Sequence, residues 1–266
     1  MKKFFAITLF LAMCAMLFAG CGGTPAASKS AVPLTQTEID QMYTSPADFK
    51  GRTVELTGVI FAEVERDADG VYFQMFQDTV NSERITIVGY ADPTIELTNG
   101  DYVKLTGVVK DVFEGENAFG AKLSAPSILA DSVEVSSYKD IAAPTLKEVV
   151  PSNNTIEQFG YSVTVNKIEL AKEETRVYLT VKNNGSNKFS LYSFNTLIIQ
   201  DGKQFEEQSN YDAGYPEVQT DLTKGVQTEG IISFPPINDG NFKLTLEGSS
   251  DNYEETLKPF EFEIVM

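Results

Sequence analysis

The chain has 266 residues, of which 38 are acidic and 21 are basic, so its formal net charge is −17. It contains no histidine, which excludes Ser-His-Asp and Cys-His catalysis and every histidine-ligated metal site. The excess of acid also argues against nucleic-acid binding, because neutralisation of phosphates by Lys and Arg supplies most non-specific affinity.

The N-terminus has the pattern of an export signal. Lys2 and Lys3 precede an uncharged run over residues 4–20, and residues 17–21 read Leu-Phe-Ala-Gly-Cys. A cysteine directly after Ala-Gly resembles the end of a bacterial lipoprotein signal, whose cysteine is lipidated and becomes the mature N-terminus. A plain secretory signal and a transmembrane helix are the alternatives. The run is at the short limit for spanning a bilayer, however, and an Ala-x-Ala cleavage site is absent.

Residues 1–20 are therefore predicted to be a signal peptide, and Cys21 the lipidation site that holds the protein on the outer face of the cytoplasmic membrane. Cys14, the other cysteine, would be lost with the signal. No thiol then remains for a disulfide, a redox pair or a zinc site, and we expect no cofactor and no metal. Residues 21–34 are small and polar, which is typical of a flexible tether.

Residues 35–138 are predicted to form two short helices and a barrel. Thr35 and Glu38 have the spacing of a capping box for a helix ending near residue 43, and Ser45-Pro46 indicates a second helix start. After these helices, hydrophobic and polar residues alternate with a period of two. This alternation predicts strands over 53–64, 71–77, 84–90, 102–113 and 119–135, with a hairpin turn at 67–70.

An internal near-repeat lies within these strands. Residues 51–61 and 100–110 match at six of eleven positions, and each copy carries a glycine in mid-strand, Gly58 or Gly107. Glycine there usually marks a bend or a bulge, and a small closed barrel needs such bends. The repeat could mark a duplicated site, but barrel curvature is the favoured interpretation. Two long bent strands among five indicate an OB-type barrel.

Residues 44–136 also resemble the OB-like domain related to anticodon-binding modules, which is found in exported bacterial proteins. The matching pieces are Ser-Pro-Ala-Asp-Phe-Lys-Gly at 45–51, the Val-x-Leu-Thr-Gly-Val repeat, and Tyr-Phe-Gln-Met at 72–75. The resemblance implies shared fold ancestry and does not imply RNA binding. Residues 44–138 hold 7 basic and 16 acidic side chains, which weighs against RNA as a partner.

Residues 139–151 are predicted to be a linker, and residues 152–266 a second domain. Short alternating strands recur there between turn signals such as Asn-Asn-Gly at 183–185 and Asp-Gly at 201–202, which indicates a sandwich. This half resembles the telokin-like, immunoglobulin-like domain of lipoproteins from Gram-positive bacteria, through Val-Lys-Asn-Asn-Gly at 181–185 and Gly-Ile-Ile-Ser-Phe-Pro at 230–235. The resemblance supplies no catalytic residues.

A candidate binding face lies on the second and third barrel strands. Alternation predicts that Val71, Phe73 and Met75 point inward, as do the isoleucines at 85 and 87. The side chains predicted to point outward are Tyr72, Gln74, Phe76, Arg84 and Thr86. Outward aromatics beside an arginine could stack an oligomeric ligand on strands that OB domains use for binding. The alternative is that the 35–49 helices or the second domain cover this face.

Other candidates are weaker. Tyr211 and Tyr215 lie in a tyrosine-rich loop that could bind peptide or sugar, or could simply pack on its own sandwich. The sequence Asp67-Ala-Asp69-Gly is faintly similar to a calcium loop, but the required late glutamate is missing. The pairs Glu63/Glu65 and Glu254/Glu255 would suit glycoside hydrolysis, or would be solvated strand faces in an acid-rich chain.

The sequence therefore predicts an all-β protein with a five-stranded OB-like barrel, an immunoglobulin-like sandwich and short N-terminal helices. The predicted function is that of a membrane-anchored, non-enzymatic binding module with a protein, peptide or glycan partner. The alternatives are a receptor for a small molecule or oligosaccharide on the OB-like face, and a hydrolase that uses carboxylates alone.

Overall fold

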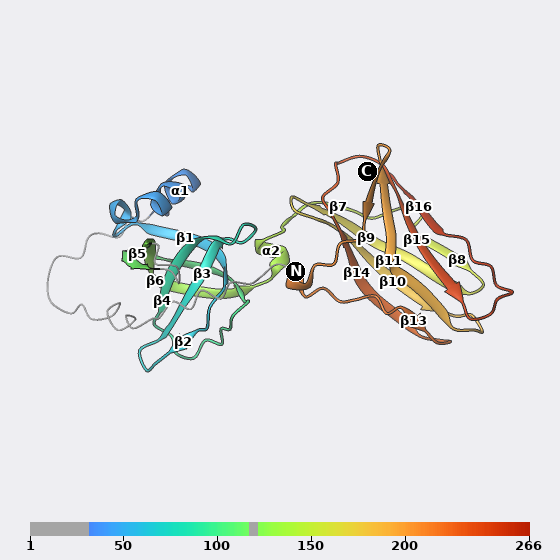
Figure 1. Cartoon of the computed structure of the whole chain (residues 1–266), viewed down its shortest axis with the longest axis horizontal. Helices are drawn as coiled ribbons and strands as arrows, with labels where there is room; N and C mark the ends of the chain where they lie inside the picture. The colour runs from blue at the N-terminus through green and yellow to red at the C-terminus, as the bar shows by residue number, and fades with distance from the viewer. Residues whose placement is uncertain (1–31, 117–121) are drawn as a thin grey trace. The chain divides into compact units, whose positions relative to one another are not determined.

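The computed structural model describes residues 32–116 and 122–266, which are mostly β-strand (Figure 1). The predicted all-β class is confirmed, because the helices among these residues are few and short. The chain divides into two compact units, with the division between Ser137 and Tyr138.

The first unit is a barrel with short helices before it. Its elements are α1 (Gln36–Thr44), η2 (Pro46–Phe49), β1 (Thr53–Ile60), β2 (Glu65–Arg66), β3 (Val71–Asp78), β4 (Glu83–Tyr90), β5 (Tyr102–Glu116) and β6 (Lys122–Ser136). The strands pair in the order β1-β5-β6-β4-β3-β2, and β1 also pairs with β3. That last pairing closes five strands into a ring, as expected of a small Greek-key barrel. The β4–β6 pairing is parallel, and the other pairings are antiparallel.

The repeated glycines lie where strands cross closely. A Cβ atom on Gly58 would lie 2.6 Å from the carbonyl oxygen of Phe76, and one on Gly107 would lie 2.5 Å from that of Leu129. The β5–β6 register also shifts between Thr106 and Gly107. Strand β1 can change partner from β5 to β3 because Gly58 has no side chain. The curvature interpretation of the repeat therefore agrees with the structure.

Helix α1 closes one end of the barrel. The predicted capping box is present, because the Thr35 side chain accepts a hydrogen bond from the Glu38 backbone and the Glu38 carboxylate accepts one from the Thr35 backbone. The helix buries Ile39 and Met42 in the barrel core. The second predicted helix start is also present, because η2 begins at Pro46 with Ser45 as its N-cap, although the Ser45 side chain makes no capping hydrogen bond.

The second unit is a sandwich of two antiparallel sheets. Its elements are α2 (Tyr138–Ile141), β7 (Thr145–Val149), β8 (Thr155–Gln158), β9 (Tyr161–Ala171), β10 (Thr175–Asn183), β11 (Phe189–Gln200), β12 (Lys203–Glu206), η3 (Tyr211–Ala213), β13 (Asp221–Leu222), β14 (Gln227–Phe234), β15 (Phe242–Ser250) and β16 (Phe260–Ile264). One sheet has the order β14-β10-β9-β7, with β8 on β9; the other has the order β12-β11-β15-β16, with β13 on β11. Both inner faces contribute to one hydrophobic core.

Part of the predicted linker is a strand of this sandwich. Residues 139–151 include most of α2 and all of β7, and β7 pairs with β9 from Thr145 to Val149. Val149 packs against the core, whereas Leu146 is exposed. The six residues between Pro144 and Pro151 show little periodicity, so this strand forms through main-chain pairing with β9.

Candidate functional site

The predicted binding face on the barrel is not formed as the sequence suggested. Tyr72 and Gln74 do point away from the barrel core, but they are only 3% and 4% exposed. Phe76 is partly buried, and its ring stacks on that of Phe61 with the centroids 3.9 Å apart. These side chains therefore do not form an open stacking platform.

Arg84 and Thr86 lie on the opposite face from the predicted one. Strand β4 pairs with β3 so that Thr86 stands opposite Met75, and directly paired residues point to the same side. Met75 is in the barrel core, so Thr86 points inward, where it is fully buried. The alternation of polar and apolar residues in β4 misled the prediction, because Thr86 has a polar partner inside: its hydroxyl lies 2.6 Å from that of Tyr43.

Helix α1 supplies the partners for this end of β4. An Arg84 guanidinium nitrogen lies 2.8 Å from a carboxylate oxygen of Asp40, and the guanidinium lies 5.7 Å from the Tyr43 ring centroid. Burial raises the pKa of the Tyr43 hydroxyl well above its usual value. Helix α1 thus contacts these two candidates on the core side of β4, whereas the alternative interpretation had the helices covering the outer face.

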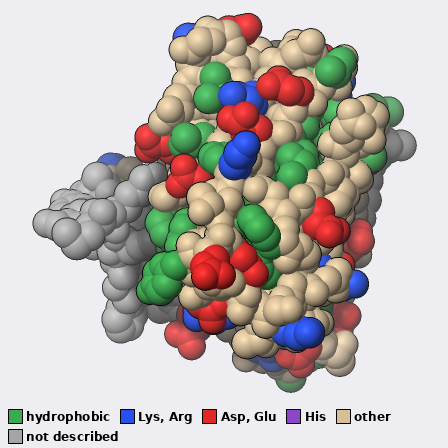
Figure 2. Space-filling model, turned by 90° about the vertical axis from the view of Figure 1, so that its right-hand side faces the viewer, with side chains coloured by type: hydrophobic (Ala, Val, Ile, Leu, Met, Phe, Trp, Pro, Cys, Tyr) green, Lys and Arg blue, Asp and Glu red, His purple; other side chains and the backbone are tan. Residues whose placement is uncertain are grey.

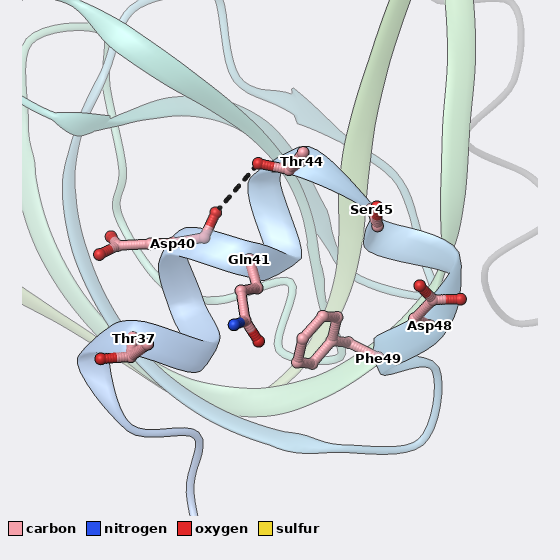
Figure 3. A pocket seen from close by; sticks show the side chains of 7 residues that line it. All are labelled: Thr37, Asp40, Gln41, Thr44, Ser45, Asp48 and Phe49. Atoms are coloured by element: carbon pink, nitrogen blue, oxygen red, sulfur yellow. Dashed lines mark hydrogen bonds between the residues drawn. The ribbon is translucent and has the colours of Figure 1, made fainter.

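A pocket of about 610 Å³ lies along α1 and η2, and it is open to solvent (Figure 3). The residues that line it are Thr37, Asp40, Gln41, Thr44, Ser45, Asp48 and Phe49. The Thr44 hydroxyl points back to the Asp40 backbone carbonyl, 3.4 Å away. Because Asp40 is already paired with Arg84, Asp48 and the four neutral polar side chains of this pocket suit a small polar molecule. Sequence reasoning missed this pocket, since the helix was considered only as a cover.

The tyrosine-rich loop, residues 207–218 around η3, holds its two tyrosines in different ways. Tyr211 is 85% exposed. The Tyr215 hydroxyl hydrogen-bonds to the Glu174 carboxylate and lies 3.3 Å from an Arg176 nitrogen. The side chain of Asn210 also donates to Glu174, at 2.9 Å. Asn210 and Tyr215, which lie on either side of the short η3 turn, are therefore hydrogen-bonded to the sandwich, and Tyr211 between them is exposed.

The support for this η3 loop is a buried charged cluster on the outer side of β9 and β10. Arg176 is fully buried, and its guanidinium donates to Glu169 at 2.9 Å and to Glu174 at 2.8 Å. It also donates to the Ala143 carbonyl at 2.8 Å and the Thr145 hydroxyl at 2.7 Å. The cluster thus joins the 138–145 segment, the two strands and the η3 loop through charge-assisted hydrogen bonds.

The electrostatics of this cluster keep the Glu169 carboxylate ionised and the Tyr215 hydroxyl protonated. Burial by itself raises the pKa of Glu169, but hydrogen bonds from Lys139, Lys167 and Tyr178 outweigh it and lower the pKa to about 2. Burial and the bond to Glu174 raise the pKa of the Tyr215 hydroxyl. A carboxylate so firmly ionised is poorly suited to act as a general acid near neutral pH. Sequence reasoning missed this cluster, because Arg176 lies on the polar side of an alternating strand, where arginine is ordinarily exposed.

The other carboxylate candidates do not come together in one site. Asp67 accepts hydrogen bonds from the backbones of Asp69 and Gly70, and so stabilises the predicted hairpin turn. Glu255 accepts bonds from Tyr161 at 2.6 Å and from Ser250 at 2.6 Å. Among the described residues, no group of three or more acidic or cysteine side chains has the arrangement of a metal site.

The predicted signal peptide, the lipidation site Cys21 and most of the tether lie outside the described residues. Within residues 32–116 and 122–266, no helix is long and apolar enough to cross a membrane.

No family model and no curated protein matches the chain. Two solved structures are similar to parts of it. The yjhA protein from Bacillus subtilis is 14% identical over 44% of this chain and 99% of its own, with a TM-score of 0.34. A functionally unknown protein from Listeria monocytogenes EGD-e is 8% identical over 47% of this chain and 86% of its own, with a TM-score of 0.33.

Proposed function

We propose that this chain is a lipid-anchored, extracytoplasmic binding protein that recognises a protein, peptide or glycan through the η3 loop of its second unit. The observation that carries the recognition site is the exposure of Tyr211, at 85%, on a loop fastened by the buried side chains of Glu174 and Arg176. The anchor rests on the lipoprotein signal that ends at Cys21.

A fastened loop is suited to binding because little conformational entropy is lost when a partner orders it. Tyrosine offers a flat apolar ring and a hydroxyl, and it has only two side-chain torsions to restrict. The lipid on Cys21 would then keep this loop near the membrane, and the 21–34 tether would set its reach. Binding without chemistry is the activity that these features favour.

We also propose the finer classification of the two units. The strand order, the glycine-marked repeat and the Ser-Pro-Ala-Asp-Phe segment support an OB-like domain related to anticodon-binding modules. The Val-Lys-Asn-Asn-Gly segment supports a telokin-like domain, since Asn183 is fully buried and caps the turn that follows it. Its side-chain nitrogen donates to two carbonyls at 2.8 Å, and its oxygen accepts from the Gly185 backbone at 2.9 Å.

Two experiments test the two parts of this proposal. For the anchor, Cys21→Ser should leave the protein unprocessed or release it into the medium, and a processed, membrane-bound Cys21→Ser protein would contradict it. For the binding site, the full chain is screened by thermal shift with sugars, cell-wall fragments and peptides. Any shift found should be lost in Tyr211→Ala but kept in Tyr253→Ala, a control that changes another exposed tyrosine.

The pocket along α1 and η2 favours a second candidate function, that of a receptor for a small polar molecule. It is favoured by the open pocket of about 610 Å³ beside Asp40 and Asp48. A ligand whose thermal shift survives Tyr211→Ala but disappears in Asp48→Ala would support this candidate. No shift from any compound would count against the receptor and against glycan binding, and would leave a protein partner for the η3 loop.

A further inference from the structure

The outer face of the β12-β11-β15-β16 sheet carries a hydrophobic stripe along β11. Ile198 lies in the sandwich core, so its neighbours Leu197 and Ile199 point to the outer face. Tyr192 lies on the same face, where its hydroxyl reaches the Ser249 hydroxyl at 2.6 Å. Its ring lies 5.9 Å from that of Phe194, in the irregular stretch where the β11–β15 register shifts.

Two of these four hydrophobic side chains are open to solvent. Phe194 is 65% exposed and Ile199 is 36% exposed, whereas Tyr192 and Leu197 are partly buried. Hydrophobic side chains of this kind are scattered over folded surfaces, and Figure 2 shows separate hydrophobic groups among charged ones on one side of the molecule. On β11 four such residues lie within positions 192–199, and the rings of Tyr192 and Phe194 lie close together. Hydrophobic residues gathered in this way are a feature of interaction surfaces.

Acidic side chains border the stripe on both sides. The pairing register places Glu206 opposite Leu197 on the β12 side, and Glu247 opposite Tyr192 on the β15 side. It also places two further glutamates of β16 on this face. All four glutamates are exposed: Glu206 and Glu247 stand next to β11, and Glu261 and Glu263 lie one strand further out, on β16 beyond β15. Lys243 is the one cation that the register places among them, and it forms an ion pair with Glu261 at 3.2 Å.

We propose that this face docks a segment of a partner protein whose hydrophobic side chains are flanked by lysine or arginine. Charge complementarity selects this occupant, because the border is acidic and largely uncompensated. A second copy of the chain, with a net charge of −17, would bring glutamates against glutamates. This surface uses different side chains from the η3 loop, so it goes beyond the proposed function.

The test uses three synthetic helical peptides with the purified full chain: one of leucine and lysine, one with glutamate in place of lysine, and one with serine in place of leucine. Binding is measured by calorimetry at two salt concentrations. The leucine–lysine peptide should bind, and binding should weaken at high salt. The other two peptides should bind at least about tenfold more weakly, because each lacks one of the two interactions.

Variants then locate the site. Glu206→Lys with Glu247→Lys, and separately Phe194→Ser with Ile199→Ser, should each weaken binding by about tenfold or more. The matched control Glu157→Lys reverses an exposed charge on β8, in the other sheet, and should leave binding unchanged. Circular dichroism confirms that each variant is folded.

Several results would overturn the proposal. These are no binding of the leucine–lysine peptide, equal binding of the glutamate peptide, or equal loss in Glu157→Lys. Concentration-dependent dimerisation that is abolished by Phe194→Ser would show instead that a second copy occupies the face. Failure of these tests leaves the role of Tyr211 untouched, since Tyr211→Ala is expected to retain the leucine–lysine peptide.

Discussion

Replacing Arg176 by methionine tests whether the buried charged cluster holds the second unit together. Methionine keeps an unbranched stem in the fully buried position but removes five hydrogen bonds, at 2.7–3.3 Å, to Glu169, Glu174, Ala143, Thr145 and Tyr215. Removing one partner of a buried ion pair costs about 3–5 kcal/mol, chiefly because the remaining charge is buried without compensation.

The partners of Arg176 are affected unequally. Glu169 keeps Lys139 and Lys167 as cationic partners, at 2.8 and 2.6 Å. Glu174 is 5% exposed, and its partners among the described residues are then the hydrogen bonds from Asn210 and from the Tyr215 hydroxyl. The uncompensated charge therefore falls mainly on Glu174. Adding Glu174→Gln to the Arg176→Met variant should recover about 1–2 kcal/mol of the free energy of unfolding.

Calorimetry with far-UV circular dichroism can follow this effect. The melting temperature of the sandwich should fall by on the order of 10–20 °C in Arg176→Met, and that of the barrel should not change. Lys172→Met is the matched control, because it removes an exposed cation of the same unit, and should cost less than about 0.5 kcal/mol. An unchanged melting temperature, or a fall confined to the barrel, would refute the conclusion that the cluster holds the second unit together.

Two further predictions concern pH and the barrel. Glu169 has a pKa lowered from 4.5 to about 2, so its stabilising contribution is present above about pH 4.5 and is lost as the pH falls towards 2. The Glu169→Gln variant should therefore lose less sandwich stability than the wild type between pH 5 and pH 2, as measured by urea unfolding; equal losses would contradict this. Gly58→Ala should destabilise the barrel by roughly 1–3 kcal/mol, because the new Cβ would lie 2.6 Å from a backbone carbonyl oxygen. A barrel melting temperature equal to that of the wild type would show that β1 can shift freely.

The sequence predicted local structure well where one physical signal dominated. The capping box at Thr35 and Glu38 is formed, and the mid-strand glycines Gly58 and Gly107 lie at close crossings of the barrel. Each of these depends on chemistry within a few residues or on the absence of a side chain. The strand β7 was missed because the six residues between Pro144 and Pro151 carry too little periodicity to distinguish a strand from a linker.

The candidate sites were harder to predict because they depend on which side chains meet. Thr86 is polar and was therefore expected outside, yet the hydroxyl of Tyr43, from a helix 43 residues earlier, satisfies it inside the barrel. Tyr211 and Tyr215 look equivalent in the sequence. They differ in the structure because Tyr215 hydrogen-bonds to the buried Glu174 and lies close to Arg176, whereas Tyr211 is exposed.

By itself the sequence determined the all-β class, the five barrel strands and the exclusion of histidine chemistry, because alternation and composition are properties of the chain. The tertiary structure alone decided the closure of the barrel through β1 and β3, the joining of Glu169, Glu174 and Arg176, and the acidic border of the β11 stripe. These depend on strand register, which sets the face and the neighbours of every side chain. Register is fixed by long-range pairing that no short segment encodes.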